Sequence, residues 1–230
     1  MSRVVGSASG LLAALWLMFA GAAFAAGQVR IDPPHRDLPA GEARSASIVL
    51  AGGCFWGVQG VFQHVKGVTA AVSGYAGGTA ATARYPLVAS GRTRHAEAVE
   101  VTYDPRQISL GRILQVFFSV AHDPTQFMRQ GPDVGPQYRS AVFPANDDQR
   151  AVVEAYIAQL AASGAYPQPV VTRVETQGGF FPAEDEHQDY MTRHPAQPYI
   201  VIHDAPKVAN LSKLFADLYR EEPVLFFARR

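Results

Sequence analysis

Cys54 is the only cysteine among the 230 residues, and this feature constrains the fold most. A chain with one cysteine forms no internal disulfide, no cysteine-rich zinc site and no CxxC redox pair. An apolar core must therefore hold the fold together. The composition supplies one, because 48% of the residues are hydrophobic and 17% are charged. One or two domains fit this length.

The charged residues balance, with 20 Lys and Arg against 20 Asp and Glu. A chain without a basic excess has little with which to hold a phosphate backbone. The charge balance therefore argues against a nucleic-acid partner.

Residues 1–25 have the pattern of a secretory signal peptide. Arg3 provides the positive start, the stretch from Leu11 to Ala26 carries no charge, and Ala23-Phe24-Ala25 is the small-x-small pattern that signal peptidase accepts. The apolar run is shorter than the roughly 18 residues expected of a membrane-spanning helix, which favours cleavage after Ala25 over retention as an anchor. We therefore expect a periplasmic or secreted protein that meets the membrane only during export.

The rest of the chain divides by composition and periodicity. Residues 26–45 are polar and rich in proline, which predicts a lead-in tether rather than a folded unit. A main domain is expected over residues 46–205, followed by a C-terminal helix and tail at 206–230. Apolar periodicity predicts strands at residues 48–51, 68–72, 98–103, 138–143 and 169–175, and helices at 55–66, 110–118, 147–160, 183–193 and 208–218.

Caps and loops complete this prediction. Ser109 and Asn146 are expected to cap the second and third helices. Loops are expected at 74–78, which is rich in glycine, and at 122–137, and loops of such length usually carry function. The order of the elements mixes local and crossover connections. We therefore expect an α/β (α+β) two-layer sandwich, in which helices pack on a ferredoxin-like mixed β-sheet with long functional loops.

Cys54 directly follows a predicted strand and Gly52-Gly53, at the first turn of a predicted helix. The unsatisfied N–H groups and the dipole of a helix start favour a negative charge, so we expect a stabilised, nucleophilic thiolate there. Exported proteins generally use cysteines in disulfides, which leaves this unpaired one either reactive or inert. The alternative is a small apolar side chain packed under the sheet.

Glu97 and Trp56 extend the candidate site. Glu97 shares the strand parity of Val99 and Val101, so its carboxyl is expected on the apolar face. A buried, unpaired carboxyl has a raised pKa and stays protonated, as a general acid requires. The alternative is a solvated residue beyond the end of the strand. Trp56 could form an apolar wall beside the sulfur, whereas Phe55 could equally belong to the core.

Two clusters raise the question of a metal site. His95-Ala96-Glu97 matches the H-x-E of zinc deaminases, but those enzymes also need a P-C-x-x-C pair that one cysteine cannot supply. The Glu184-Asp185-Glu186-His187 cluster is explained by a helix dipole better than by a metal site. No metal is therefore expected.

Gly53-Cys54-Phe55-Trp56-Gly57 resembles the active-site signature of the A-type peptide methionine sulfoxide reductases. The resemblance runs in family order from about Ala46 to Tyr199 and is highly specific. It is also carried by Gly74-Tyr75-x-Gly77-Gly78, Tyr85-x-x-Val88-x-Ser90-Gly91, His95-Ala96-Glu97-Ala98-Val99, His122-Asp123-Pro124, Arg129-Gln130-Gly131-x-Asp133-x-Gly135-x-Gln137-Tyr138-Arg139-Ser140 and Ala183-Glu184-Asp185-x-His187-Gln188-x-Tyr190.

This resemblance implies an oxidoreductase that repairs oxidative damage. Its substrate is the S epimer of methionine sulfoxide, free or in proteins, and its main domain is the catalytic domain. Cys54 is similar to the family's nucleophile, which attacks the sulfoxide sulfur and becomes a sulfenic acid, the reversible rung of cysteine oxidation. Phe55 and Trp56 match the apolar pocket for the methyl group of the substrate.

The remaining catalytic positions also follow from the resemblance. Tyr85, Glu97 and Tyr138 match the groups that hydrogen-bond the sulfoxide oxygen, with Glu97 as the proton donor. Asp133 matches an acidic residue of the same site, more plausibly an organiser than a reactant.

Two features depart from the family pattern. Many members carry one or two further cysteines that attack the sulfenic acid and pass a disulfide to thioredoxin. Ala89 stands where some relatives place such a cysteine, and the tail from Leu225 to Arg230 has none. The chain therefore needs an external thiol, thioredoxin-like or a small dithiol, and no metal or organic cofactor. Thr79–Arg84 also stands where relatives more often have an Asn-Pro segment before Tyr85.

Two other functions fit a lone cysteine. A cysteine hydrolase or acyltransferase would activate Cys54 with His95 or His187 and form an acyl-enzyme. A non-catalytic extracytoplasmic binding module would bury the thiol, so that Cys54 would resist alkylation. A reductase would instead accumulate sulfenic acid when no thiol is supplied.

Overall fold

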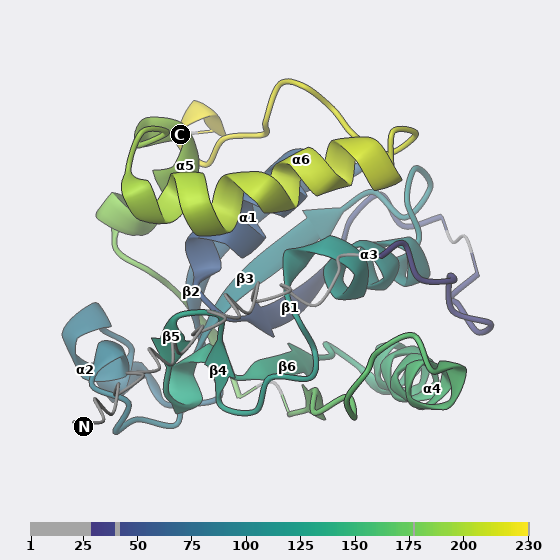
Figure 1. Ribbon diagram of the computed structural model, residues 1–230, viewed down its shortest axis with the longest axis horizontal. Coiled ribbons are helices and arrows are strands. Elements are labelled where there is room, and N and C mark those ends of the chain that lie inside the picture. Colours follow the sequence, from purple (N-terminus) through teal and green to yellow (C-terminus); the bar gives the residue numbers. More distant parts are fainter. Residues whose placement is uncertain (1–28, 40–41, 177, 230) are drawn as a thin grey trace, which may run out of the picture.

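A six-stranded β-sheet forms the centre of the protein (Figure 1). The computed structural model describes residues 29–39, 42–176 and 178–229, so the signal predicted at residues 1–25 lies outside the described residues. The strands of this sheet are β1 (Ala46–Gly52), β2 (Val68–Ala76), β3 (Ala96–Tyr103), β6 (Ser140–Phe143), β7 (Arg173–Val174) and β8 (Phe180–Pro182). Their order is β7-β6-β1-β3-β2-β8, and neighbours are antiparallel except for β6 and β7, which are parallel.

Helices connect and cover these strands. The α-helices are α1 (Phe55–Gln63), α2 (Tyr85–Ala89), α3 (Leu110–Val116), α4 (Asp147–Ser163), α5 (Tyr190–Arg193) and α6 (Ala205–Leu214). A π-helical turn at Phe117–Ala121 continues α3, and another at Ile200–Asp204 precedes α6. A small two-stranded sheet pairs β4 (Arg129–Gln130) with β5 (Asp133–Val134), and 3₁₀ turns occupy Ala80–Thr82, Pro136–Tyr138, Asp185–His187 and Phe227–Arg229.

The connection from β1 to β6 confirms the expected fold class. The chain runs β1-α1-β2-β3-α3-β6, and the four strands are ordered β6-β1-β3-β2. This βαββαβ connection is ferredoxin-like. The parallel pair of β6 and β7 makes the extended sheet mixed.

Both faces of the central strands are buried, but with different side chains. One face presents Ile48, Leu50, Val99 and Val101 to the helices, in the main apolar core. The other face presents mostly small side chains, Val49, Ala51, Ala76, Ala96, Ala98, Ala141 and Phe143. Figure 1 shows α1, α3 and α6 together on one side of the sheet. Burial of the large side chains on this side supplies the main stabilisation, about 25 cal/mol per Å² of apolar surface.

The predicted helix caps are present. Ser109 Oγ accepts a hydrogen bond from Arg112 N–H at 3.3 Å at the start of α3, and Asn146 Oδ1 accepts one from Gln149 N–H at 2.9 Å at the start of α4. Each bond satisfies a backbone donor that a helix start would otherwise leave unpaired.

Strand lengths differ from the prediction near both edges of the sheet. β2 continues through Gly74 to Ala76, where the glycines predict a loop, because Gly74 pairs with Ala98 on one side and Pro182 on the other. A side chain at Gly74 would overlap the ring of Phe180, so glycine is what allows β8 to pair so closely. At the other edge, the strand predicted at 169–175 is reduced to the two residues of β7.

The helix predicted at 183–193 is interrupted. The 3₁₀ turn ends at His187, Gln188 is extended, and Asp189 has φ +53°, a left-handed conformation, before α5 begins at Tyr190. This segment therefore forms two short helical turns instead of one continuous helix.

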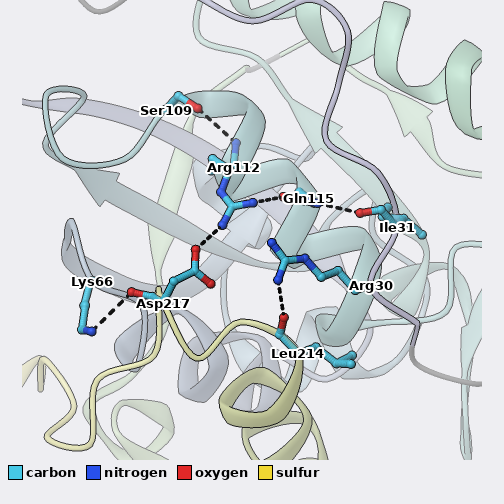
Figure 2. Close-up of polar contacts among 8 residues, drawn as sticks. All are labelled: Arg30, Ile31, Lys66, Ser109, Arg112, Gln115, Leu214 and Asp217. Atoms are coloured by element: carbon cyan, nitrogen blue, oxygen red, sulfur yellow. Dashed lines mark hydrogen bonds and ion pairs between the residues drawn. The ribbon is translucent and has the colours of Figure 1, made fainter.

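The lead-in at residues 29–39 contains no helix or strand but is bound to the domain instead of being a free tether. Ile31 is buried in the main core, and its carbonyl accepts a hydrogen bond from Gln115 Nε2 at 2.6 Å. Figure 2 shows Arg30 donating to Leu214 O at 2.9 Å, beside an ion pair of Arg112 with Asp217. No helix among the described residues is long and apolar enough to cross a membrane.

Candidate active site

Cys54 lies between β1 and α1 and is the N-cap residue of α1. Gly53 before it has φ +92°, and a side chain at that position would overlap Gln130. Cys54 is 8% exposed and contributes to the wall of a cavity of about 420 Å³. The thiol is therefore buried but borders a cavity.

Glu97, the second residue of β3, lies beside the start of α1. Its Oε2 accepts a hydrogen bond from Phe55 N–H at 3.2 Å, and the residue is 2% exposed. The interior position that strand parity predicts for this carboxyl is confirmed. Burial raises the pKa of Glu97 to about 8, against the lowering effect of the Phe55 hydrogen bond. The carboxyl is therefore mainly protonated at neutral pH.

The ionisation predicted for Cys54 is wrong. Burial raises the pKa of the thiol well above its ordinary value, and the charges of Glu97 and Asp204 raise it further. A hydrogen bond from the Trp56 N–H and the charge of Lys207 lower it, but they do not offset burial. In the resting protein the sulfur is therefore a thiol, not a standing thiolate.

A wall of aromatic rings follows Cys54. Trp56 stacks face to face on Tyr190, with ring centroids 3.7 Å apart and 7° between the planes, and meets Tyr199 edge-on at 5.9 Å. Phe55 is fully buried, with its ring 5.9 Å from that of Tyr75. Phe55 thus belongs to the core as well as to the site, whereas Trp56 keeps part of its surface exposed.

Glu184 holds Tyr85 in place. Its Oε1 accepts the backbone N–H of Tyr85 at 2.9 Å, and its Oε2 accepts the hydroxyl of Tyr75 at 2.7 Å. The ring of Tyr85 lies 4.3 Å from the ring of His187. The sequence interpretation of Glu184 as a partner of a helix dipole misses this positioning role.

A long loop brings Asp133 and Tyr138 to the same region. Asp133 Oδ2 accepts a hydrogen bond from the hydroxyl of Tyr199. Burial raises the pKa of Tyr138, and the charges of Glu97 and Asp133 raise it further. Burial also raises the pKa of Tyr85, with a second contribution from the charge of Glu97. Both phenols therefore remain protonated and can donate hydrogen bonds.

Neither histidine considered as a base is hydrogen-bonded to Cys54. His95 is buried, with Nε2 3.0 Å from Thr79 O. His187 lies among the rings of Phe55, Trp56 and Tyr85, and neither of its nitrogens has a hydrogen-bond partner among the described residues. This part of the chain therefore lacks the cysteine–histidine pair that a hydrolase uses.

The described residues contain no group of three His, Cys, Asp or Glu side chains arranged to hold a metal ion. The groups that do gather at the start of α1 are a thiol, a protonated carboxyl and phenols. These groups are suited to nucleophilic attack coupled to proton transfer.

Sequence reasoning missed several residues of this region. Tyr190 and Tyr199 complete the aromatic wall, and Asp204 and Lys207 form a buried ion pair against α1, with Nζ and Oδ1 3.1 Å apart. All four come from the C-terminal part of the chain, and only Tyr190 lies within a quoted motif. The sequence does contain the pair Tyr190 and Tyr199, nine positions apart. Only the fold shows that both rings contact Trp56.

A sequence model of the family described as "Peptide methionine sulfoxide reductase" matches residues 46–218. The chain belongs to this family. Two relatives agree with the match. "Peptide methionine sulfoxide reductase MsrA 2" of Mesorhizobium japonicum is 58% identical over 181 residues, which are 79% of this chain and 93% of that protein. The protein of the same name from Synechocystis sp. is 50% identical over 169 residues, 74% of this chain and 79% of its own.

Solved structures of the family share the fold. The reduced form of Mxr1 from Saccharomyces cerevisiae has a TM-score of 0.59 at 30% identity, over 69% of this chain and 90% of that one. Methionine sulfoxide reductase A of Corynebacterium diphtheriae has a TM-score of 0.56 at 35% identity, over 74% and 85%. The protein is therefore an oxidoreductase, a peptide-methionine (S)-S-oxide reductase, rather than a hydrolase or a binding module.

Proposed function

We propose that the enzyme reduces methionine-(S)-sulfoxide, free or in proteins, through a sulfenic acid on Cys54 that an external thiol removes. One observation carries the proposal. Phe55 directly follows Cys54 in the chain. Its backbone N–H donates a hydrogen bond of 3.2 Å to the Glu97 carboxyl and fixes it at the start of α1. A proton donor and a sulfur nucleophile thus share one helix start.

The sulfoxide oxygen is a poor leaving group until it is protonated. Glu97 gives its proton to this oxygen while the Cys54 sulfur attacks the sulfoxide sulfur, and the thiol proton passes to the Glu97 carboxylate. The oxygen then moves with its proton to Cys54, while its own bond to the methionine sulfur and the transient bond between the two sulfurs both break. The methionine sulfur gains two electrons and Cys54 loses two, giving methionine and a sulfenic acid.

The other residues of the site orient this reaction. The protonated hydroxyls of Tyr85 and Tyr138 donate hydrogen bonds to the oxygen as its charge develops. Phe55 and Trp56 hold the methyl group of the substrate. Asp133 organises the site through its hydrogen bond with Tyr199 and does not react itself.

The sulfenic acid must be reduced from outside, because the chain has one cysteine. A thioredoxin-like protein or a small dithiol fills this role, and no metal or organic cofactor takes part. The apolar segment at residues 1–25 supports a site of action outside the cytoplasm, in the periplasm or medium. A purified protein whose N-terminus is Ala26 would support this location, whereas an intact Met1 in the cytosolic fraction would contradict it.

Turnover with separated sulfoxide epimers tests the activity. Peptides with the S epimer should be reduced in the presence of a dithiol, and peptides with the R epimer should remain unchanged. Cys54→Ser should retain the fold, judged by circular dichroism, and keep less than about a tenth of the activity, because the nucleophile is lost. Wild-type turnover by this variant would contradict the proposed role of Cys54.

A further inference from the structure

Cys54 borders a cavity that is not lined by the side chains proposed to bind the sulfoxide. This cavity, which we name the α6 cavity, has a volume of about 420 Å³ and lies between the loop at 122–132 and the start of α6. Its lining includes Cys54 and Tyr199, but none of the side chains proposed to contact the sulfoxide, which are Phe55, Trp56, Tyr85, Glu97 and Tyr138. Cys54 therefore borders a space that none of these side chains lines.

The wall of the α6 cavity carries one half of an ion pair, between Lys207 and Asp204, whose charges both act on the Cys54 thiol. Lys207 lines it and is only 12% exposed at the side chain, with Asp204 fully buried behind it. A Cβ placed on Gly57 would lie 2.7 Å from Lys207 Nζ, so the ammonium lies against the first turn of α1, which Cys54 caps. Asp123, an acid of the lining, accepts hydrogen bonds from the Thr125 hydroxyl and from a neighbouring glutamine.

We propose that the α6 cavity admits the low-molecular-weight thiol that regenerates Cys54, so that sulfoxide and thiol reach the sulfur from different sides. This inference rests on the proposed function. The attacking group is a thiolate, and Lys207, which is paired with Asp204 at 3.1 Å, is a cationic side chain of the cavity lining. The volume lies in the range of about 300–1,000 Å³ that is typical of small-molecule sites.

The regeneration balances with two thiols. The first thiolate attacks Cys54 Sγ, a sulfur–sulfur bond forms, and the bond from Sγ to oxygen breaks. The oxygen leaves as hydroxide and takes a proton to become water. The second thiolate then attacks the external sulfur of the mixed disulfide, which releases Cys54 as a thiolate that takes up a proton. Two thiols are oxidised to one disulfide, and one sulfenic acid is reduced.

Two exposed neighbours provide a matched pair of variants. Ile202 lines the α6 cavity and is 63% exposed, whereas Val201 is 52% exposed and lies outside the lining. Ile202→Trp should narrow the entrance, and Val201→Trp adds the same ring next to it. The measurements are the KM for glutathione and for dithiothreitol in steady state, and the single-turnover rate of Cys54 oxidation by a sulfoxide peptide without thiol.

Ile202→Trp should raise the KM for both small thiols about tenfold or more and leave the single-turnover rate within about twofold of wild type. Val201→Trp should change neither. An unchanged KM in Ile202→Trp, an equal rise in both variants, or a defect confined to thioredoxin as reductant would overturn the inference. If the wild-type protein showed no Cys54 oxidation at all, the proposed function itself would fail, which separates the two failures.

Discussion

Among single residues, Glu97 sets the pH range of the proposed reaction at Cys54. Its carboxyl is neutral below a pKa of about 8, because burial disfavours the charged form. The Cys54 thiol is also protonated, since burial raises its pKa as well. The resting site therefore holds the proton that the sulfoxide oxygen needs, and the limit on activity lies at alkaline pH.

The variant Glu97→Gln tests this limit. In the wild type, the rate of Cys54 oxidation should fall as pH rises through about 8, because ionised Glu97 has no proton to donate. Glu97→Gln should lower the rate at neutral pH by about 10²-fold and should also lose this decline with pH. Single-turnover quench experiments across the pH range measure both effects.

Glu100→Gln is the matched control, because Glu100 lies on the same strand and burial also raises its pKa. Its pH profile should equal that of the wild type. An alkaline decline that persisted in Glu97→Gln would assign the proton donor to another group.

The position of each side chain of the candidate site was easier to predict than its ionisation. Strand parity was enough to bury Glu97, because neighbours two residues apart share a face. The helix start next to Cys54 indicated a thiolate, but the degree of burial and the charge of Asp204 come from distant parts of the chain. Burial and this charge together outweigh the effect of the helix start on the pKa of Cys54.

At the scale of elements, the turn before α5 connects the aromatic wall to α1 and to the C-terminal tail. Asp189 accepts hydrogen bonds from Gln63 Nε2 at 2.6 Å and from the backbone N–H groups of Phe226 and Phe227 at 2.9 and 3.1 Å. The next residue, Tyr190, stacks on Trp56. The tail is therefore part of the support of this wall.

Shortening the tail tests this support. Truncation after Leu225 removes two donors from the buried carboxylate of Asp189, so the free energy of unfolding should fall by about 1–3 kcal/mol. The KM for the sulfoxide should rise more than kcat falls, because the wall loses its support. Truncation after Phe227 keeps both donors and should resemble the full chain. Equal urea midpoints for the two shortened proteins would contradict this role of the tail.

This turn also shows where the local sequence pattern stops being sufficient. The spacing of apolar residues at 183–193 predicts one helix, but the left-handed Asp189 is held by donors from α1 and from the tail. Short edge strands are equally hard to predict from the local sequence. β8 pairs only because Gly74 leaves room for Phe180, and nothing within residues 180–182 indicates that partner.

For the molecule as a whole, the lead-in adds to the stability of the domain. Ile31 is 5% exposed within the main core, and Tyr156 of α4 donates its hydroxyl to Asp32 O at 2.7 Å. Composition alone predicted a tether here, because proline and polar residues dominate the segment. Ile31 in the core, Leu38 packed against it, and side-chain hydrogen bonds to the segment's carbonyls hold it on the domain.

Ile31→Ala should therefore lower the free energy of unfolding by about 2–4 kcal/mol, as expected for a large-to-small change in a core. Val29→Ala is the control, because Val29 is 56% exposed, and should change stability by less than about 0.5 kcal/mol. Urea denaturation of both variants compares them. Equal stability would mean that the lead-in contributes little to the fold.

The overall architecture was predictable because the helices and strands of the ferredoxin-like core carry their own periodicity and caps. The candidate site was predictable where motifs lie at the ends of elements, as at Cys54 and Glu97. The parts that depend on contacts between distant segments, such as Tyr199 against Trp56, follow only from the assembled fold.

The most direct test of the proposed chemistry is the mass of the Cys54 peptide after one turnover with a methionine-(S)-sulfoxide peptide and no thiol. Cys54 should gain one oxygen atom, with one methionine formed for each enzyme molecule oxidised. An unmodified Cys54 after methionine has formed would contradict the proposed chemistry.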